Sequence, residues 1–441
     1  CWESALQKIG DADRPDPDGM SFDEWTEDHP VFDATETLSR IRQAAHSRRV
    51  SAPALLCCVL GRVLAEVPPS VMLPPTIGSA ASLNLAIAFV GDPGNGKSSL
   101  LGVSAELLGV NQSPIERGVG SGEGLIESFL VKLTVPDPND PKKSLTVKVM
   151  ADPPARIFDV DEIEHLGGVG ARSGSTILPI LRTALMGGAL KTSNATEDRT
   201  RSVERHSYRL VLVVMVQPEL SHHLLNGANS GMPQRFVWVE TTDPTTPDEK
   251  PEWPGEIDWS PSALELMEPQ EIDYPDHIKA EIDEHQRRVQ RQEDVDPMEG
   301  HLRLTRLKVA AALAFLHGEF AITDRWWDLS GRVMEWSAEA QERCRSALAA
   351  AGSRRNAAKG RSLAEVEEAS DAHKLEAARR ALLAVVKRHP DGVSKNAARR
   401  ALSHSHRAYV DKAVSDLDAA GLIRVEGAKQ GGSRLWPTTL A

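Results

Sequence analysis

The sequence predicts an α/β fold with a parallel sheet, which follows N-terminal helices and precedes a helical region and a small C-terminal domain. Three observations lead to this prediction. Between residues 76 and 243, apolar runs of strand length alternate with segments of helical apolar spacing, as in parallel sheets. One of these runs leads directly into a glycine-rich turn followed by a helix. Beyond residue 275 the apolar spacing is helical, and helices and strands mix again in residues 372–441.

Composition is that of a globular protein that does not enter a membrane. The 441 residues suffice for several domains, and 41% of them are hydrophobic and 26% charged. Uninterrupted apolar runs such as Leu210 to Val216 are far shorter than a membrane span, and no secretory signal opens the chain. We therefore expect a cytoplasmic protein, although a first residue of Cys1 rather than Met is compatible with a piece of a longer one. The four cysteines form no CxxC pair, and we expect no zinc site.

Charge is distributed unevenly along the chain. The net charge of −12 argues against a polyanionic partner for the chain as a whole. Residues 373–441, however, carry 13 Lys and Arg against 6 Asp and Glu, whereas residues 1–372 carry 38 against 57. A basic end on an acidic body suggests that the C-terminal domain meets a polyanion.

Apolar periodicity gives the order of the elements. Strands are expected at 85–90, 155–160, 209–216 and 235–240, helices at 97–108, 122–131, 175–187 and 219–225, and a hairpin at 133–149. The predicted regions are an N-terminal helical region (1–75), an α/β core (76–243), a proline-rich acidic connector (244–275), a helical lid or bundle (276–350), a polar linker (351–371) and a C-terminal domain (372–441).

A phosphate-binding loop follows the first predicted strand. It reads Gly91-Asp92-Pro93-Gly94-Asn95-Gly96-Lys97-Ser98, with a helix after it that continues through Ser99. Its glycines allow a tight turn, so that backbone N–H groups and the helix N-terminus face phosphate oxygens. Lys97 would contact the β- and γ-phosphates and Ser98 would ligate Mg²⁺, so a P-loop NTPase fold with ATP and Mg²⁺ as cofactors is expected. The alternative is a glycine-rich turn that binds nothing.

Two adjacent carboxylates end the second predicted strand. Asp161 would hold the Mg²⁺ shell, and Glu162 would orient and deprotonate the attacking water. Buried adjacent carboxylates are costly unless a metal ion or solvent meets them. The alternative is a solvated acidic loop that also includes Asp159 and Glu164.

The segment from Ile157 to Glu164 resembles the Walker B strand of AAA+ ATPases, which implies a parallel sheet of the AAA+ or RecA-like kind. Gln217, after strand 209–216, matches the sensor-1 position, where a polar side chain positions the lytic water. Arg235, in Gln234-Arg235-Phe236, is similar to the arginine finger of helicase-like members. The resemblance implies that Arg235 acts on a neighbouring subunit's γ-phosphate in a homo-oligomer, expected as a hexameric ring. The alternative for Arg235 is a surface salt bridge.

More narrowly, the chain resembles helicase-like ATPases of phage, plasmid and other mobile-element replication proteins, often found behind a primase-polymerase domain. The residues that carry this resemblance span about 50 to 345 and include the glycine run Gly118 to Leu125 and the helical segment Leu304 to Ala310. No primase-polymerase portion is recognisable, so no priming activity is inferred. The resemblance implies a lid arginine at Arg306 or Arg303. The glycine run is expected to be a loop that faces a neighbouring subunit or DNA.

The polar stretch between Gly167 and Arg205 precedes the sensor strand, where related motors place pore loops. The resemblance implies that Lys191, Arg199 and Arg201 contact single-stranded DNA there. The alternative is a solvated hairpin.

The C-terminal domain has a winged-helix pattern, with helices at 374–388, 394–402 and 406–420 and two strands around a glycine-rich tip. Its candidates for phosphate contacts on duplex DNA are Lys395, Arg399, Arg400, Arg407, Lys412, Lys429 and Arg434. The helix at 406–420 also carries Asp411, Asp416 and Asp418, which phosphates repel, so docking to a protein is the alternative.

Together these motifs predict an ATP-hydrolysing, oligomeric DNA helicase or translocase in the replication of a phage or other mobile element. Lys97, Glu162, Gln217 and Arg235 are its catalytic candidates. The alternative is an ATP-switched DNA-binding or assembly protein, an initiator without unwinding activity.

Overall fold

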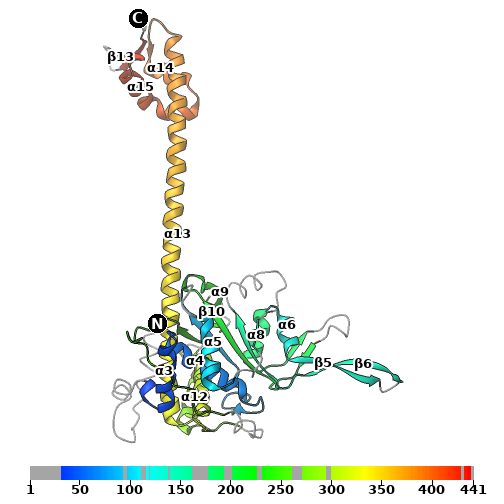
Figure 1. The fold of residues 1–441 in the computed structure, drawn as a ribbon. Coiled ribbons are helices and arrows are strands. Elements are labelled where there is room, and N and C mark those ends of the chain that lie inside the picture. Colours follow the sequence, from blue (N-terminus) through cyan, green and yellow to red (C-terminus); the bar gives the residue numbers. More distant parts are fainter. Residues whose placement is uncertain are drawn as a thin grey trace. The chain divides into compact units, whose positions relative to one another are not determined.

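The computed structural model describes residues 31–92, 97–110, 116–118, 120–137, 140–160, 177–192, 201–225, 231–260, 271–294, 299–428 and 432–438. By its contacts the chain divides into two compact units, Cys1–Ala349 and Ala350–Ala441. The first unit is a mixed α/β structure with a parallel sheet, in agreement with the predicted α/β class (Figure 1).

A five-stranded sheet forms the centre of the first unit, in the order β11-β3-β10-β7-β4, and every pairing in it is parallel. Its strands are β3 (Leu85–Val90), β4 (Glu116–Gly118), β7 (Ala155–Val160), β10 (Arg209–Val216) and β11 (Phe236–Glu240). All residues of β3 and β10 are buried, as expected of a parallel sheet that is covered on both faces. The bounds of β3, β7 and β10 are those predicted, and β11 starts one residue later.

Helices cover both faces of the sheet. Alternation along β3 shows this directly, because Ile87 and Phe89 belong to one hydrophobic core and Ala86 and Ala88 to the other. The first core includes α3 (Glu36–Ser47), α4 (Ala52–Glu66), α5 (Lys97–Leu108) and α12 (Glu299–Leu316), and the second includes α6 (Gly122–Ser128), α8 (Ile177–Leu185) and α9 (His222–Leu225). The connection from β3 to β4 passes through α5 on one face of the sheet. The connections that lead back from β4 to β7, β10 and β11 pass through α6, α8 and α9 on the other face, as right-handed crossovers require.

Capping side chains fix where several helices begin. Thr35 accepts a hydrogen bond from the Leu38 amide, and Ser51 from the Ala54 amide. Ser121 likewise accepts from the Gly124 amide at the start of α6. The glycine run Gly118 to Leu125 thus leads from the end of β4 into the first turn of α6, so its second half belongs to the helix predicted at 122–131 and not to the expected loop.

Three small antiparallel hairpins accompany the sheet. They are β1 (Met72–Leu73) with β2 (Ala81–Ser82), β5 (Leu130–Asp137) with β6 (Asp140–Met150), and β8 (Leu190–Thr192) with β9 (Arg201–Val203). The β5–β6 ribbon includes the predicted hairpin at 133–149 and extends away from the parallel sheet (Figure 1).

After β11, residues 243–260 contain no helix or strand, as predicted for the proline-rich connector. Polar side chains of α3 bind its backbone, since Arg40 donates to the carbonyls of Pro254 and Glu256 and Gln43 to that of Glu252. The helical region then follows, with α11 (Asp276–Gln290), α12 and α13 (Asp324–Lys387). In the described part of the chain, no helix combines the length and apolarity needed to cross a membrane.

Residues 351–371, expected as a polar linker, are helical and belong to the 64-residue α13. The segment is rich in Ala, Glu and Arg, which favour helix even where nothing packs on them.

The second unit combines the end of α13 with α14 (Lys395–Ala401), a 3₁₀ helix His404–Tyr409, α15 (Val410–Ala419) and a three-stranded sheet. The sheet has the order β12 (Val393–Ser394), β14 (Gly432–Pro437) and β13 (Ile423–Ala428), with antiparallel pairings. Leu382, Val386, Leu417 and Leu435 are among its core residues. The expected helix 406–420 is split, because its first residues form the 3₁₀ helix.

Candidate nucleotide site

The candidate site lies at the carboxyl edge of the parallel sheet. The connection after β3 leads toward β4, whereas the connection after β10 passes β3 and leads to β11, so the two leave in opposite directions. In open α/β sheets, ligands bind at the carboxyl ends of strands where the direction changes in this way. Gly91 and Gln217 follow these two strands, and the Gly91 amide donates to the Val216 carbonyl at 3.0 Å. The phosphate loop sequence therefore starts at the switch point of the sheet.

The described residues include only part of the predicted phosphate site. Gly91 is buried, Asp92 and Ser99 are exposed, and α5 begins at Lys97. Gln217 is half-buried directly after β10. The other predicted residues of the site lie outside what the structure describes, namely Pro93, Gly94, Asn95, Gly96, the side chains of Lys97 and Ser98, Asp161 and Glu162.

Strand β7 leads toward the same edge. Its last residue, Val160, pairs with Val214 of β10, two positions before the end of that strand. The acidic pair Asp161-Glu162 follows Val160 directly in the sequence.

Arg343 is a cation at this edge that the sequence did not reveal. It lies on α13, forms an ion pair with Glu240 at the end of β11, and its Nη2 lies 3.7 Å from Oδ2 of Asp92. Register pairs Glu240 with Val90, and the Thr241 amide donates to the Val90 carbonyl at 2.8 Å. The start of the phosphate loop, the end of β11 and α13 are thus joined by this arginine.

Arg306 and Arg303, the two candidates for a lid arginine, lie elsewhere. Arg306 is buried, stacks 3.7 Å from the Trp327 ring centre and donates to the Trp327 carbonyl. Arg303 forms an ion pair with Glu281.

Two contacts place helix α12, which carries both arginines, at the amino edge of the sheet. Thr305 Oγ1 donates to the Gln234 carbonyl before β11, and Lys308 Nζ to the Asn84 carbonyl before β3. Arg306 and Arg303 therefore contribute to the packing of α12 at the amino edge. Arg343, by contrast, lies beside the start of the phosphate loop.

Arg235 also lies at the amino edge, directly before β11. Its Nη1 donates to the Gly231 carbonyl at 2.7 Å, and its Nη2 lies 3.0 Å from Nε2 of His301. Burial, together with the nearby Arg182, lowers the pKa of Arg235. Burial and the cations Arg235 and Lys308 lower the pKa of His301 to about 4, so its imidazole is neutral and can accept from the guanidinium.

The length of β11 separates Arg235 from the phosphate loop of its own chain. The strand has five residues, which at the usual rise of about 3.3 Å per residue span about 16 Å. Arg235 can therefore contact a bound triphosphate only if that triphosphate belongs to another copy of the chain.

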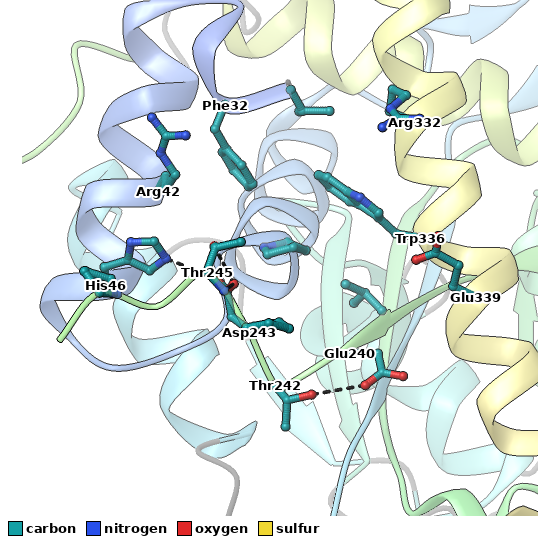
Figure 2. A pocket seen from close by; sticks show the side chains of 15 residues that line it. Phe32, Arg42, His46, Glu240, Thr242, Asp243, Thr245, Arg332, Trp336 and Glu339 are labelled. Atoms are coloured by element: carbon teal, nitrogen blue, oxygen red, sulfur yellow. Dashed lines mark hydrogen bonds and ion pairs between the residues drawn. The ribbon is translucent and has the colours of Figure 1, made fainter. Parts of the chain in front are cut away.

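A pocket of about 620 Å³ lies beside the end of β11, within the usual size range of small-molecule sites. Phe32 and Trp336 line it, with ring centres 5.8 Å apart and nearly parallel planes (Figure 2). Glu240, which binds Arg343, lines it as well, so the pocket adjoins the candidate phosphate site.

Asp243 is the centre of a hydrogen-bond network on the polar side of this pocket. Its Oδ2 lies 3.1 Å from Nε2 of His46 and accepts from the Ala52 amide at the start of α4. Burial raises the pKa of Asp243, but hydrogen bonds from Thr245, the Ala52 amide and His46 outweigh it and hold the pKa below its usual value.

The candidate DNA contacts differ in their availability. Lys191 is exposed and lies 3.7 Å from Glu204, whereas Arg201 donates to Glu127 at 2.8 Å. Arg199 lies outside the described residues.

Among the candidate DNA contacts of the second unit, three basic side chains bond to residues outside their own helix or strand. Lys395 pairs with Asp411, Arg407 donates to the Leu402 carbonyl, and Arg434 to the Asp391 carbonyl. Three others are exposed, namely Arg399, Arg400 and Lys412, although Arg400 also donates to the Asn396 carbonyl of its own helix at 3.3 Å. Lys429 lies outside the described residues.

No cluster of three or more His, Cys, Asp or Glu suited to a metal ion occurs among the described residues. The expected Mg²⁺ ligands Ser98 and Asp161 are not part of that set. Comparison with protein-family models gives no match for the chain, and comparison with curated proteins gives no relative.

Proposed function

We propose that the protein is an ATP-hydrolysing, oligomeric DNA helicase or translocase that acts in the replication of a phage or other mobile element. One observation supports the nucleotide chemistry above all others. The sequence from Gly91 to Ser98 has the phosphate-loop pattern and joins β3 to α5 at the switch point of a parallel sheet.

In this proposal, the triphosphate lies at the N-terminus of α5, where backbone N–H groups and Lys97 bind its oxygens. Ser98 and Asp161 provide the oxygen ligands that Mg²⁺ prefers, and the ion would neutralise phosphate charge. Glu162 takes the proton of the attacking water, and Gln217 orients that water. Arg343 gains a phosphate partner in place of Asp92, so it couples nucleotide binding to α13.

We assign the base and ribose to the pocket lined by Phe32 and Trp336. Its aromatic rings suit stacking on a nucleobase, and Glu240, which lines it, binds the same Arg343 that lies beside Asp92 of the phosphate loop. The pocket therefore extends the phosphate site to a full nucleotide site.

Arg235 supports the oligomeric part of the proposal. It is too far from its own phosphate loop to act there, so a role on the γ-phosphate requires a neighbouring subunit. A closed ring, expected as a hexamer, gives every loop one such arginine.

The second unit is interpreted as a winged helix that binds duplex DNA through Arg399, Arg400 and Lys412. The basic balance of residues 373–441 supports this role. The alternative, an ATP-switched assembly protein without unwinding, is favoured by the internal bonds of Lys395, Arg407 and Arg434, which leave fewer cations for phosphates.

The rate of ATP hydrolysis with and without single-stranded DNA separates the two functions. A motor is expected to hydrolyse ATP several-fold faster on single-stranded DNA and to displace a strand from a forked duplex. A rate that ignores DNA, with no displacement, would contradict the motor and favour the switch.

A further inference from the structure

The β5–β6 ribbon has one polar face. Cross-strand register pairs Lys132 with Lys148 and Thr134 with Thr146 on this face. Residues paired in this way lie on the same side of a ribbon. Lys132 and both threonines are exposed, and the two aspartates of the ribbon lie beyond these pairs, at its tip. Along these pairs the ribbon therefore presents ammonium and hydroxyl groups and no carboxylate of its own.

Positive charge is concentrated at the base of this face. Lys132 lies directly opposite Lys148, and like charges in that position destabilise a strand pair. Glu127 of α6 relieves part of the repulsion, because its Oε2 accepts from Lys148 Nζ at 3.1 Å. The same oxygen accepts from Arg201 Nε of β9 at 2.8 Å. Of these four side chains, three are cations and one is a carboxylate, so this part of the surface favours an anionic ligand.

The pKa of Glu127 reflects this excess of cations. Burial raises the pKa, but hydrogen bonds from Lys148 and Arg201 outweigh it and hold the pKa of Glu127 below its usual value. The carboxylate therefore stays charged and remains bound to both cations, whereas Lys132 is left to the ligand.

The shape of the ribbon fits the major groove of duplex DNA. Its two strands extend away from the parallel sheet (Figure 1). A two-stranded ribbon can enter the major groove of B-DNA, which is about 12 Å wide. Lysine and threonine side chains bind phosphates and base edges there.

Other macromolecules match the polar face less well. A single strand is held by cations together with aromatic rings on which its bases stack, and residues 130–150 contain no aromatic residue. Duplex RNA has a major groove too narrow for side chains to read. Protein interfaces are centred on apolar and aromatic side chains, whereas the Lys and Thr pairs of this face are polar.

We infer that the polar face of the β5–β6 ribbon binds duplex DNA in its major groove. Lys132 and Lys148 lie near the base of the ribbon and contact phosphates at the mouth of the groove. Thr134 and Thr146 lie nearer the tip and face base edges. The inference rests on the proposed function only in that the partner is DNA.

Binding of the full chain to fluorescent duplex DNA, measured without nucleotide over a range of salt, tests this inference. K132Q removes an ammonium group from the polar face, and K250Q removes one from an exposed lysine of the connector. We expect K132Q to weaken binding several-fold and to reduce the slope of log affinity against log salt by about one, as loss of one phosphate contact does. K250Q should change neither, and K132Q should bind single-stranded DNA and duplex RNA of the same sequence as the wild type does.

A short thiol-linked photo-crosslinker on either face gives a second arm. S144C places it on the polar face and L145C on the aliphatic one, and both side chains are exposed. Cys57, Cys58 and Cys344 are buried, and the unsubstituted chain serves as the blank. We expect position 144 to label duplex DNA and position 145 not to label it.

Three results would overturn the inference: equal binding and salt slope in K132Q and K250Q, equal crosslinking from the two positions, or a K132Q loss as large for single-stranded DNA or duplex RNA as for duplex DNA. A chain that binds duplex DNA through the ribbon without hydrolysing ATP would refute the proposed function and support this inference.

Discussion

Arg235 and His301 form a hydrogen-bonded pair, and burial lowers the pKa of both side chains. The guanidinium keeps its charge, whereas the imidazole is held neutral and can therefore accept a hydrogen bond. Gly231 completes the arrangement, since a Cβ there would lie 2.6 Å from Cδ2 of His301. The residue that we propose to act on a neighbouring nucleotide is thus oriented by groups from two elements.

The lowered pKa of His301 predicts how stability depends on pH. Because the folded pKa is about 4 rather than 6.5, the unfolded state alone gains this proton as pH falls between those values, and stability falls with it. H301Q lacks the group and should lose less stability over the same range. Urea unfolding at pH 6.5 and just above pH 4 measures this, with H404Q, an exposed histidine, as the matched control. Equal losses in H301Q and the wild type would contradict the buried neutral imidazole.

Substitution of Trp336 tests whether the pocket that it lines binds the base. Loss of one base-stacking ring costs about 1–3 kcal/mol, so W336A should weaken ATP binding roughly tenfold. Isothermal titration measures the affinity. The control is W253A, which removes a ring that stacks 4.5 Å from Arg48 and does not line the pocket. Equal effects of the two substitutions would argue against a base in this pocket.

At the scale of elements, α12 and α13 pack through Arg306, and a glycine makes this contact possible. A Cβ on Gly331 of α13 would lie 2.9 Å from Nη2 of Arg306, which its bonds to Trp327 hold in place. G331A should therefore destabilise the first unit by about 1–3 kcal/mol, as overpacking usually does. Differential scanning calorimetry measures this against G352A in the same helix, where no atom lies within 4 Å and no loss is expected. If G331A unfolded with the same free energy as the wild type, the Arg306 side chain would be shown to move aside at no cost.

Strands β3 and β10 could be predicted to the residue because each has a long apolar run, as parallel strands buried on both faces do. Strand β7 contains Arg156 and Asp159, and its bounds were predicted from its place before the acidic pair Asp161-Glu162. Strand β4 was missed because it is three residues long and two of them, Glu116 and Arg117, are charged.

Candidate site residues could be named from the sequence only where a local motif exists. The phosphate loop has a fixed spacing, whereas Arg343 reaches it through the fold from a helix more than two hundred residues away. For the same reason, the packing of Arg306 against Trp327 could not be seen in the sequence.

For the whole molecule, the proposed oligomer depends on Arg235 acting as an arginine finger, because this residue lies too far from its own phosphate loop to act there. Loss of an arginine finger lowers turnover by about 10³-fold or more, so R235A should be nearly inactive while it still binds ATP. A mixture of R235A and K97A should regain activity. In mixed oligomers, the R235A chain supplies an intact phosphate loop and the K97A chain supplies Arg235. Steady-state ATPase assays of mixtures measure this, and a mixture no more active than its components would contradict action between subunits.

ATP binding and turnover, measured on the same samples, test whether Gly91 to Ser98 and Asp161-Glu162 form an ATP-hydrolysing site. K97A should weaken binding by about ten- to a hundredfold, since it removes a charged hydrogen bond to phosphate. E162Q should bind ATP as the wild type does and hydrolyse it about 10²- to 10⁴-fold more slowly. Normal turnover in E162Q, or normal binding in K97A, would show that these residues do not form an ATP-hydrolysing site.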